Sequence, residues 1–334
     1  MKNSDTLFKK MVGNENALRQ LSADIAAGRF PHALLIEGPA GCGKKTLARQ
    51  LAMAAVCENT DSRPCGVCNP CRKVEQGIHP DVEMVTGGTG SSNSFHIDRI
   101  RELRDGAFVL RNEAAVRVLI LCDAHTMTPQ AQNALLKILE EPPKHLVFIL
   151  TCENRAQMLA TIRSRVQVVT LGGVEWEQAA PLLRERLPDA DEQTLYRAFA
   201  VSGGVIGKVL TDVEDDTLQK VLEVSPLLAE ALLAPSAWPF MKLTGRLEKD
   251  KPAIAGVLNA LTLILRDALT LHYGGENTIS TAPETARKLA SNMSGKRLLA
   301  MLDVLEEMRQ ANIRNMNLTL LLSRLWAKLR NCGK

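Results

Sequence analysis

The sequence lacks three features that would assign it at once to a compartment or a partner. Residues 1–10 contain no apolar stretch of the kind found in a secretory leader, and no later run of uninterrupted apolar residues reaches the length of a membrane span. The formal net charge of +4 is too small to indicate nucleic-acid binding, because basic patches act through clustering rather than through their sum. We therefore expect a cytoplasmic protein without membrane association, in which cysteines stay reduced.

The order of apolar segments divides the chain into an α/β region and an all-α region. With 334 residues, the chain is long enough for two or three domains with apolar cores. Strand segments alternate with helical patterns up to residue 171, which predicts a parallel sheet covered on both faces, with ligands at the carboxyl ends of its strands. We expect strands at 33–36, 82–85, 116–122, 146–151 and 166–170, and a loop at 87–94. Only helical patterns follow Gly172-Gly173, and they suggest a small bundle to about residue 212 and a larger one after it.

A glycine-rich stretch after the first expected strand has the spacing of a phosphate-binding loop. It lies between the apolar run 33–36 and a helical pattern over 47–56. In such a loop, backbone N–H groups and a helix N-terminus face the phosphates, and the loop lysine reaches the β- and γ-phosphates. The residues that would form this cradle are Gly38, Gly41, Gly43, Lys44, Lys45 and Thr46. The alternative is a glycine-rich turn between a strand and a helix that binds no ligand.

Two positions depart from the pattern of a working ATPase. The residue after the loop lysine, which usually carries a hydroxyl that binds Mg²⁺, is Lys45, and the nearest hydroxyl, Thr46, comes one residue late. A strong strand signal ends in Asp123, the position of a Mg²⁺ ligand, but Ala124 stands where a glutamate often polarises the attacking water. His125 follows, and we interpret it as structural rather than as a replacement base. The sequence thus leaves open whether the loop binds ATP and Mg²⁺, and it argues against efficient hydrolysis.

Half of the cysteines are clustered in one segment, 57–71. These residues have the spacing C-x₇-C-x₂-C-x₂-C and are Cys57, Cys65, Cys68 and Cys71. The two short spacings let thiolates converge on one tetrahedral ion, which predicts a closed structural zinc site. Disulfides, disfavoured by the compartment, and an iron–sulfur cluster are the alternatives for the same ligands. Basic residues flank the cluster, but no aromatic side chain does, so we expect the segment to support folding rather than to bind DNA.

An arginine lies where a helical pattern ends and the last strand signal begins. This residue, Arg165, is part of the run T-I-R-S-R-V over 161–166. At the rim of a nucleotide-binding domain, an arginine can donate to the γ-phosphate bound by a neighbouring subunit. From the residues alone, a solvated or salt-bridged side chain is an equally good interpretation, because the motif is too short to decide.

Together, these features resemble the AAA+ clamp-loader subunits of bacterial DNA polymerase III, and among them the delta-prime type. The resemblance rests on the helix signature Q-N-A-L-L-K-I-L-E-E-P-P over 132–143, the S-R-V run at 164–166, the degenerate phosphate loop and the four-cysteine insert. It covers the first two-thirds of the chain strongly and the last third less so. Motor subunits are similar but have an intact loop hydroxyl, a glutamate after the strand aspartate, and an arginine where this chain has Ile206. Three departures in one direction favour a non-motor subunit.

The resemblance implies a domain plan and a function. The expected fold is a RecA-like AAA+ parallel-sheet domain over 1–171 that carries the zinc insert 57–71, a small helical lid over 172–212, and a helical collar over 213–334. The expected function is to help gamma/tau-type and delta-type subunits open a sliding clamp and place it on primed DNA during replication. Little or no ATP hydrolysis of its own is implied.

The resemblance also implies roles for two residues. Arg165 would be a finger offered in trans to a neighbouring motor subunit. Thr151 would take the place of the polar sensor on the fourth strand, beside the candidate ATP and Mg²⁺ ligands. The alternative is that the chain is itself an active motor subunit of the gamma/tau type.

Overall fold

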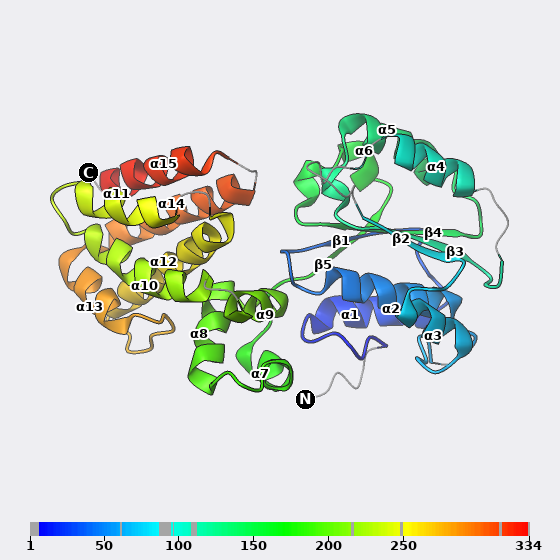
Figure 1. Ribbon diagram of the computed structural model, residues 1–334, viewed down its shortest axis with the longest axis horizontal. Helices are drawn as coiled ribbons and strands as arrows, with labels where there is room; N and C mark the ends of the chain where they lie inside the picture. The colour runs from blue at the N-terminus through cyan, green and yellow to red at the C-terminus, as the bar shows by residue number, and fades with distance from the viewer. Residues whose placement is uncertain are drawn as a thin grey trace. The chain divides into compact units, whose positions relative to one another are not determined.

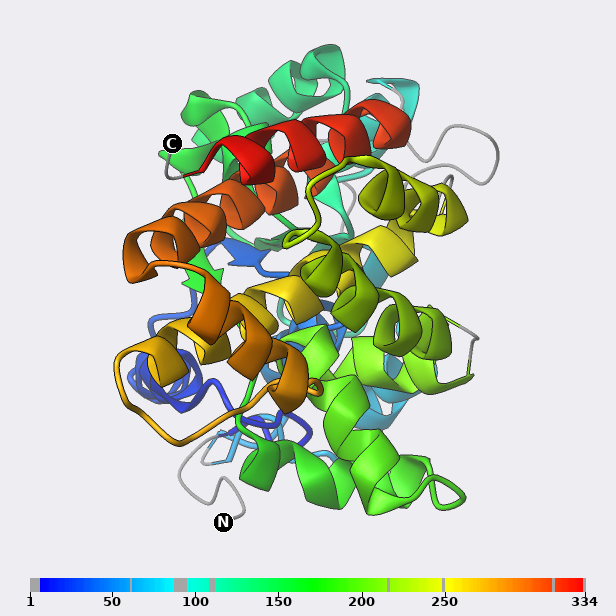
Figure 2. The ribbon, with the colours of Figure 1, turned by 90° about the vertical axis from the view of Figure 1, so that its left-hand side faces the viewer.

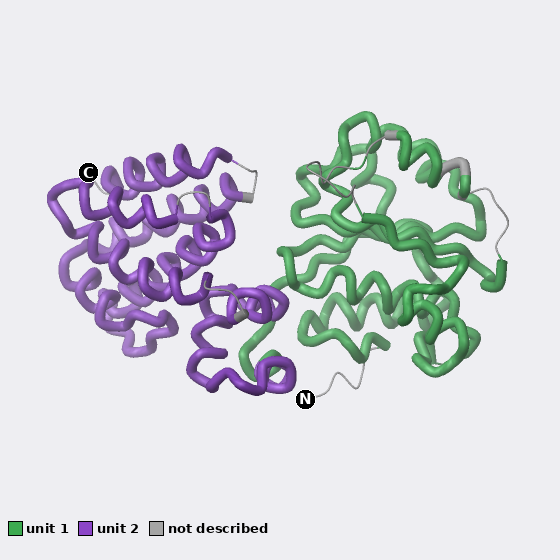
Figure 3. The backbone as a smooth tube through the Cα atoms, in the orientation of Figure 1, with its two compact units in different colours: residues 1–179 green, residues 180–334 purple. Residues whose placement is uncertain are grey.

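The computed structural model describes residues 7–60, 62–86, 95, 97–107, 112–214, 217–247, 250–313 and 316–332. The chain forms two compact units, residues 1–179 and 180–334 (Figure 3). The division of the helical part near residue 212 stays a prediction. The expected loop at 87–94 lies outside the described residues.

Unit 1 is built around a five-stranded parallel sheet with the strand order β2-β3-β4-β1-β5. Its strands are β1 (Ala33–Glu37), β2 (Val82–Val85), β3 (Arg117–Leu121), β4 (Leu146–Cys152) and β5 (Gln167–Thr170). The expected α/β class and all five strands are confirmed, with ends that differ by one residue at most. Every residue of β4 is buried, as expected for a central strand covered on both faces. The carboxyl ends of β1, β3 and β4 consequently share one edge of the sheet.

Helices cover both faces of this sheet (Figure 1). One face carries α1 (Glu15–Ala26), α2 (Lys44–Val56) and α3 (Asn69–Gln76), and the other carries α4 (Ile97–Ala107), α5 (Pro129–Glu140) and α6 (Ala160–Arg163). Side chains of β1 alternate between the two apolar cores: Leu34 and Ile36 pack on the α2 side, and Leu35 packs on the α5 side. Burial on both faces explains why the central strands β1, β3 and β4 contain apolar runs without polar alternation.

A buried carboxylate ties the start of β2 to the segment that enters β3. Asp81 is 1% exposed, and its oxygens accept backbone N–H bonds from Asn112 at 2.7 Å, Glu113 at 2.7 Å and Ala114 at 2.8 Å. Burial alone would raise the pKa of this carboxyl group, but the N–H donors outweigh burial and lower the pKa below its usual value. The carboxylate therefore stabilises the fold in its ionised form.

The variant Asp81→Asn is expected to lower the free energy of unfolding of unit 1 by about 2–3 kcal/mol at pH 7, because an amide cannot replace all three N–H acceptor contacts of the carboxylate. Since the folded-state pKa is depressed, this stabilisation is complete above the unfolded value of 3.8 and is lost as the pH falls through the folded value. Urea unfolding at several pH values measures the difference between variant and wild type. Asp98→Asn, at a 79% exposed side chain, is the matched control, and equal effects of both variants would contradict the assignment.

Unit 2 is a helical bundle, and the residues that the structure describes there contain no strand. Its helices, counted from the one that crosses the unit boundary, are α7 (Trp176–Arg186), α8 (Glu192–Ser202), α9 (Ile206–Glu214), α10 (Thr217–Ala231), α11 (Trp238–Thr244), α12 (Lys251–His272), α13 (Pro283–Asn292), α14 (Gly295–Ile313) and α15 (Leu318–Asn331). The expected all-α region is thereby confirmed.

The longest helix, α12, runs through the middle of this bundle (Figure 2) and packs against α10, α13 and α14. By length and composition alone, α12 is apolar enough to cross a membrane. Its apolar side chains, among them Leu258, Leu261 and Leu265, are fully buried within the bundle. Near its end, the buried Asp267 accepts N–H bonds from Ile279 and Ser280. Burial in the core of unit 2 therefore accounts for the hydropathy of α12.

Candidate functional site

The phosphate loop connects β1 to α2 through a backbone that requires glycine. Gly41 has φ +84° and Gly43, the N-cap of α2, has φ +95°, which are left-handed conformations that side chains disfavour. At Gly38 a Cβ atom would lie 2.4 Å from the carbonyl oxygen of Leu171, so only glycine fits there. The sequence spacing thus corresponds to a real strand–loop–helix turn at the carboxyl edge of the sheet.

The loop lysine lies inside this turn. Lys44 is 6% exposed, and its ammonium group donates to the carbonyl oxygens of Gly38 at 2.7 Å and Pro39 at 2.9 Å. These two bonds satisfy a charge that would otherwise be costly to bury. Lys44 is consequently held at the centre of the cradle, where it can exchange loop carbonyls for phosphate oxygens.

The neighbouring lysine meets the aspartate at the end of β3. The Lys45 ammonium nitrogen lies 3.2 Å from the Asp123 carboxylate, and the two side chains are 53% and 37% exposed. The backbone N–H of Asp123 donates to the Thr151 hydroxyl at 2.9 Å, and Thr151 is fully buried on β4. The structure therefore brings together three residues that the sequence singled out separately.

These residues do not fit a catalytic Mg²⁺ ion. Magnesium needs an octahedral shell of oxygen ligands, whereas a lysine ammonium has only donors and repels a cation. Thr46 is exposed one position further along α2, about 100° around the helix from Lys45. Ala124 is fully buried and offers no carboxylate next to Asp123. Burial also lowers the pKa of His125 and so favours the neutral form of its imidazole.

The four clustered cysteines converge on one point at the junction of α2 and α3. Cys57 follows the last residue of α2, Cys68 is the N-cap of α3, and Cys71 lies within α3. Together with Cys65, their sulfur atoms lie within 4.8 Å of one another. A tetrahedral zinc ion with ~2.3 Å bonds to sulfur separates its ligands by about 3.8 Å, so a small contraction would close the site.

Backbone N–H groups donate to two of the sulfur atoms in this cluster. The N–H of Cys68 donates to the Cys65 sulfur at 3.4 Å, and the N–H of Cys65 donates to the Cys57 sulfur at 3.4 Å. Donation by the backbone of Cys68 and Val67 lowers the pKa of the Cys65 thiol to about 6, which favours the thiolate that binds metal. The four thiols are free and share one centre, so the residues present fit a four-thiolate metal site.

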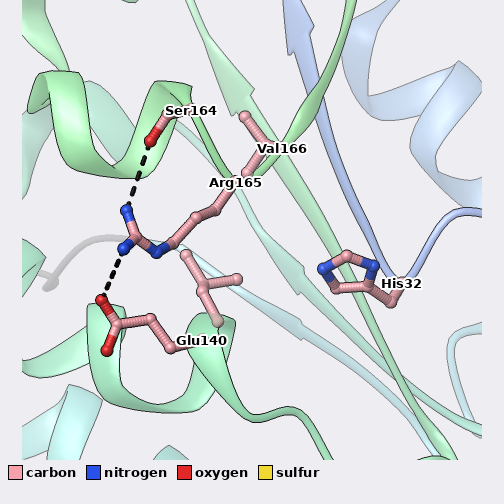
Figure 4. Close-up of a pocket in the computed structure, with 6 residues that line it drawn as sticks. His32, Glu140, Ser164, Arg165 and Val166 are labelled. Carbon is pink, nitrogen blue, oxygen red and sulfur yellow. Dashed lines mark hydrogen bonds and ion pairs between the residues drawn. The ribbon is translucent and has the colours of Figure 1, made fainter.

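Arg165 lies at the rim of unit 1, between α6 and β5. It borders an open pocket of about 610 Å³ that is also lined by His32, Leu139 and Glu140. Its guanidinium group forms an ion pair with Glu140 at 2.8 Å and donates to the Ser164 hydroxyl at 3.2 Å (Figure 4). It also donates to the Thr161 carbonyl oxygen at 2.9 Å. The side chain is 35% exposed. In the isolated chain, Arg165 is therefore salt-bridged and still accessible, which is compatible with both interpretations drawn from the sequence.

Helix α5 supplies the partner of this arginine. The Thr128 hydroxyl caps α5 by accepting the N–H of Ala131 at 3.2 Å, as the Thr-Pro sequence predicts. Gln132, buried on α5, accepts the N–H of Leu159 at 2.8 Å and so fixes the start of α6. Glu140 ends α5 and faces Arg165. The sequence analysis did not identify Glu140, although it lies inside the helix signature.

Comparison with known proteins matches the chain to subunits of DNA polymerase III. The family described as "DNA polymerase III, delta subunit" matches residues 13–175. DNA polymerase III subunit delta' of Escherichia coli K12 is 30% identical over 285 residues, which cover 85% of this chain and 83% of that protein. The delta' subunit of Yersinia pestis is 33% identical over 221 residues, 66% of this chain and 60% of that protein.

A second kind of relative is more similar to this chain, but over fewer residues. DNA polymerase III subunit gamma/tau of Mycobacterium bovis is 41% identical over 159 residues, which are 47% of this chain and 27% of that protein. The chain therefore spans about a quarter of the length of this relative. Identity is higher with this gamma/tau subunit, but the Escherichia coli delta' match covers 85% of this chain.

Proposed function

Because the chain belongs to the delta-prime family of DNA polymerase III clamp-loader subunits, we propose that it is the non-motor subunit of a clamp loader. In this role it joins gamma/tau-type and delta-type subunits that open a sliding clamp and place it on primed DNA. The helical lid over 172–212 and the collar over 213–334 belong to the same proposal, with the collar holding the subunits together. The compartment that we propose is the cytoplasm, where replication takes place in bacteria.

The observation that carries this proposal is the ion pair between Lys45 and Asp123. A motor subunit needs a Mg²⁺ ion between the loop hydroxyl and the strand aspartate, together with a residue that orients the attacking water. Here a lysine replaces the hydroxyl and pairs with the aspartate, and Ala124 offers no acidic group. Little or no hydrolysis at this loop is the expected consequence.

Three site assignments complete the proposal. Arg165 is the finger that donates to the γ-phosphate bound by an adjacent motor subunit, a step for which its ion pair with Glu140 must open. The four-cysteine cluster holds zinc as a structural ion that joins α2 to α3. The cradle from Gly38 to Thr46, with Asp123 and Thr151, binds a nucleoside triphosphate without turning it over.

The second candidate function is a motor subunit of the gamma/tau type. The 41% identity to a gamma/tau subunit over 159 residues favours it. The two candidates differ in what the purified chain does with ATP, and in what the loader loses when the chain is missing.

We expect the purified chain to hydrolyse ATP no faster than its Lys44→Ala variant, because the loop lacks the means to hold Mg²⁺ and to activate water. We also expect a loader reconstituted without this chain to lose transfer of labelled clamp to primed circular DNA. Phosphate release and clamp transfer are the two measurements. Robust turnover that Lys44→Ala abolishes would overturn the proposal in favour of the motor, and clamp loading that persists without the chain would contradict the subunit assignment.

A further inference from the structure

We propose that the Lys45 ammonium group replaces the magnesium ion of this phosphate loop, so that the loop binds a nucleoside triphosphate without a metal. This inference rests on the proposed function only in treating the loop as a nucleotide site. It adds the identity of the cation and the reason for the missing hydrolysis. A side chain of this protein would thus provide the positive charge that a bound Mg²⁺ ion provides in related loops.

The positions of both partners are fixed by the fold. Lys45 is the second residue of α2, directly after the buried Lys44. Asp123 follows β3, where its N–H donates to Thr151 and its carbonyl oxygen accepts the Thr126 hydroxyl at 2.8 Å. The ammonium and the carboxylate therefore meet at the place where a loop hydroxyl and a strand aspartate would enclose Mg²⁺.

The ion pair is too exposed to be explained by stability. The side chains of Lys45 and Asp123 are 53% and 37% exposed, and surface pairs of this kind contribute little to folding. Their significance lies in electrostatics, because a positive charge already occupies the position next to the carboxylate. A divalent cation would have to displace the ammonium group and would find one protein oxygen ligand fewer than in a loop with a hydroxyl.

The same ammonium group can still contact phosphate. A lysine ammonium has three donors, and the ion pair with Asp123 uses one of them. Lys44, whose ammonium group donates to two carbonyl oxygens of the loop, supplies a second positive charge. Two ammonium groups can balance part of the triphosphate charge, but neither can hold phosphate oxygens and water together in one coordination shell as a metal does. With ammonium groups in place of the metal, the loop is therefore expected to bind the triphosphate without hydrolysing it.

The test compares nucleotide binding by the full chain in Mg²⁺ and in EDTA, with fluorescent mant-ATP as the probe. We expect the wild-type affinity to change less than about twofold between the two conditions, because the loop makes no use of the metal. Lys45→Thr restores a hydroxyl beside Asp123, and its affinity is expected to rise at least tenfold when Mg²⁺ is added. Electron paramagnetic resonance with Mn²⁺ and ATP should detect a bound ion in Lys45→Thr and none in the wild type.

Two further variants separate the explanations. Lys45→Ala removes the ammonium group without adding a hydroxyl, so it should bind mant-ATP more weakly in both conditions. Lys137→Thr makes the same chemical change at an exposed lysine of α5 and should behave like the wild type. Wild-type binding that requires Mg²⁺, a Lys45→Thr variant that ignores it, or no binding by the wild type in either condition would each overturn the inference. Transfer of the clamp to primed DNA tests the subunit assignment separately, so this inference can fail while that assignment stands.

Discussion

Arg165→Ala is expected to slow ATP hydrolysis at the neighbouring motor site of the assembled clamp loader by a factor of about 10³ or more. An arginine finger stabilises the charge that develops on the transferred phosphoryl group, and its removal typically costs 10³–10⁵ in rate. DNA-stimulated phosphate release by the reconstituted loader is the measurement. Because other sites in the ring keep their own fingers, single-turnover hydrolysis at the affected site is the sharper readout.

The substitution should leave the chain folded and incorporated in the loader. The Arg165 and Glu140 side chains are 35% and 47% exposed, so their ion pair contributes at most about 1 kcal/mol to stability. Gel filtration of the loader and thermal unfolding of the chain verify this. A loss of activity that is accompanied by loss of the subunit would therefore not count as a finger effect.

Arg163 provides the matched control for this experiment. It is exposed two residues before Arg165, on the last position of α6. Arg163→Ala removes the same charge from the same segment and should leave turnover unchanged. Arg165→Lys keeps the charge but loses the planar fork, so it should recover only part of the activity. Unchanged single-turnover hydrolysis in Arg165→Ala would remove the finger role, and Arg165 would then be a surface salt bridge.

The structural features that could be predicted from the sequence are those that depend on local patterns of residues. The three central strands β1, β3 and β4 contain uninterrupted apolar runs, and burial on both faces is the physical reason that such runs can be recognised. The Thr128 cap and the stop after Glu140 follow from neighbouring residues in the chain. The cysteine spacing indicated a common centre because two short intervals restrict where the thiols can go.

Contacts between segments that are far apart in the sequence could not be predicted from these local patterns. Lys45 was predicted as a departure from a motif, but its partner, Asp123, depends on how α2 packs beside the end of β3. The pair between Arg165 and Glu140 likewise depends on how α5 and α6 pack, which the buried Gln132 helps to fix. No local periodicity encodes such pairs, because each requires a specific tertiary arrangement of two elements.

The two pairs together describe a division of labour within the proposed ring of subunits. In our proposal, Lys45 takes the position of the catalytic metal in this chain's own loop, whereas Arg165 serves the nucleotide of a neighbour. Lys45 pairs with Asp123 and Arg165 pairs with Glu140, so the two proposed sites share no residue and can be tested independently. A subunit can therefore lack ATP hydrolysis at its own loop and still be required for ATP hydrolysis at an adjacent subunit.

The double substitution Cys65→Ser and Cys68→Ser is expected to remove one equivalent of zinc and to lower the stability of unit 1 by about 4 kcal/mol or more. Metal binding contributes directly to folding where the ligands have no other framework, and loss of a metal is among the most destabilising single causes. The cluster joins the end of α2 to the start of α3, whose Cys71 and Val74 are buried in the core of unit 1. For a unit of this size, the melting temperature should fall by roughly 10 °C.

Metal analysis and thermal unfolding measure these effects, and Cys332→Ser, at a half-buried cysteine outside the cluster, is the matched control. A preparation that contains iron and sulfide would contradict the zinc assignment. The affinity of the reconstituted loader for primed DNA, measured at one fixed salt concentration, then tests whether the insert also binds DNA. The segment around the cluster has no aromatic side chain for base stacking, so we expect DNA affinity to follow the amount of folded subunit. A selective loss of DNA binding in a variant that still folds and incorporates would instead assign the insert to the DNA interface.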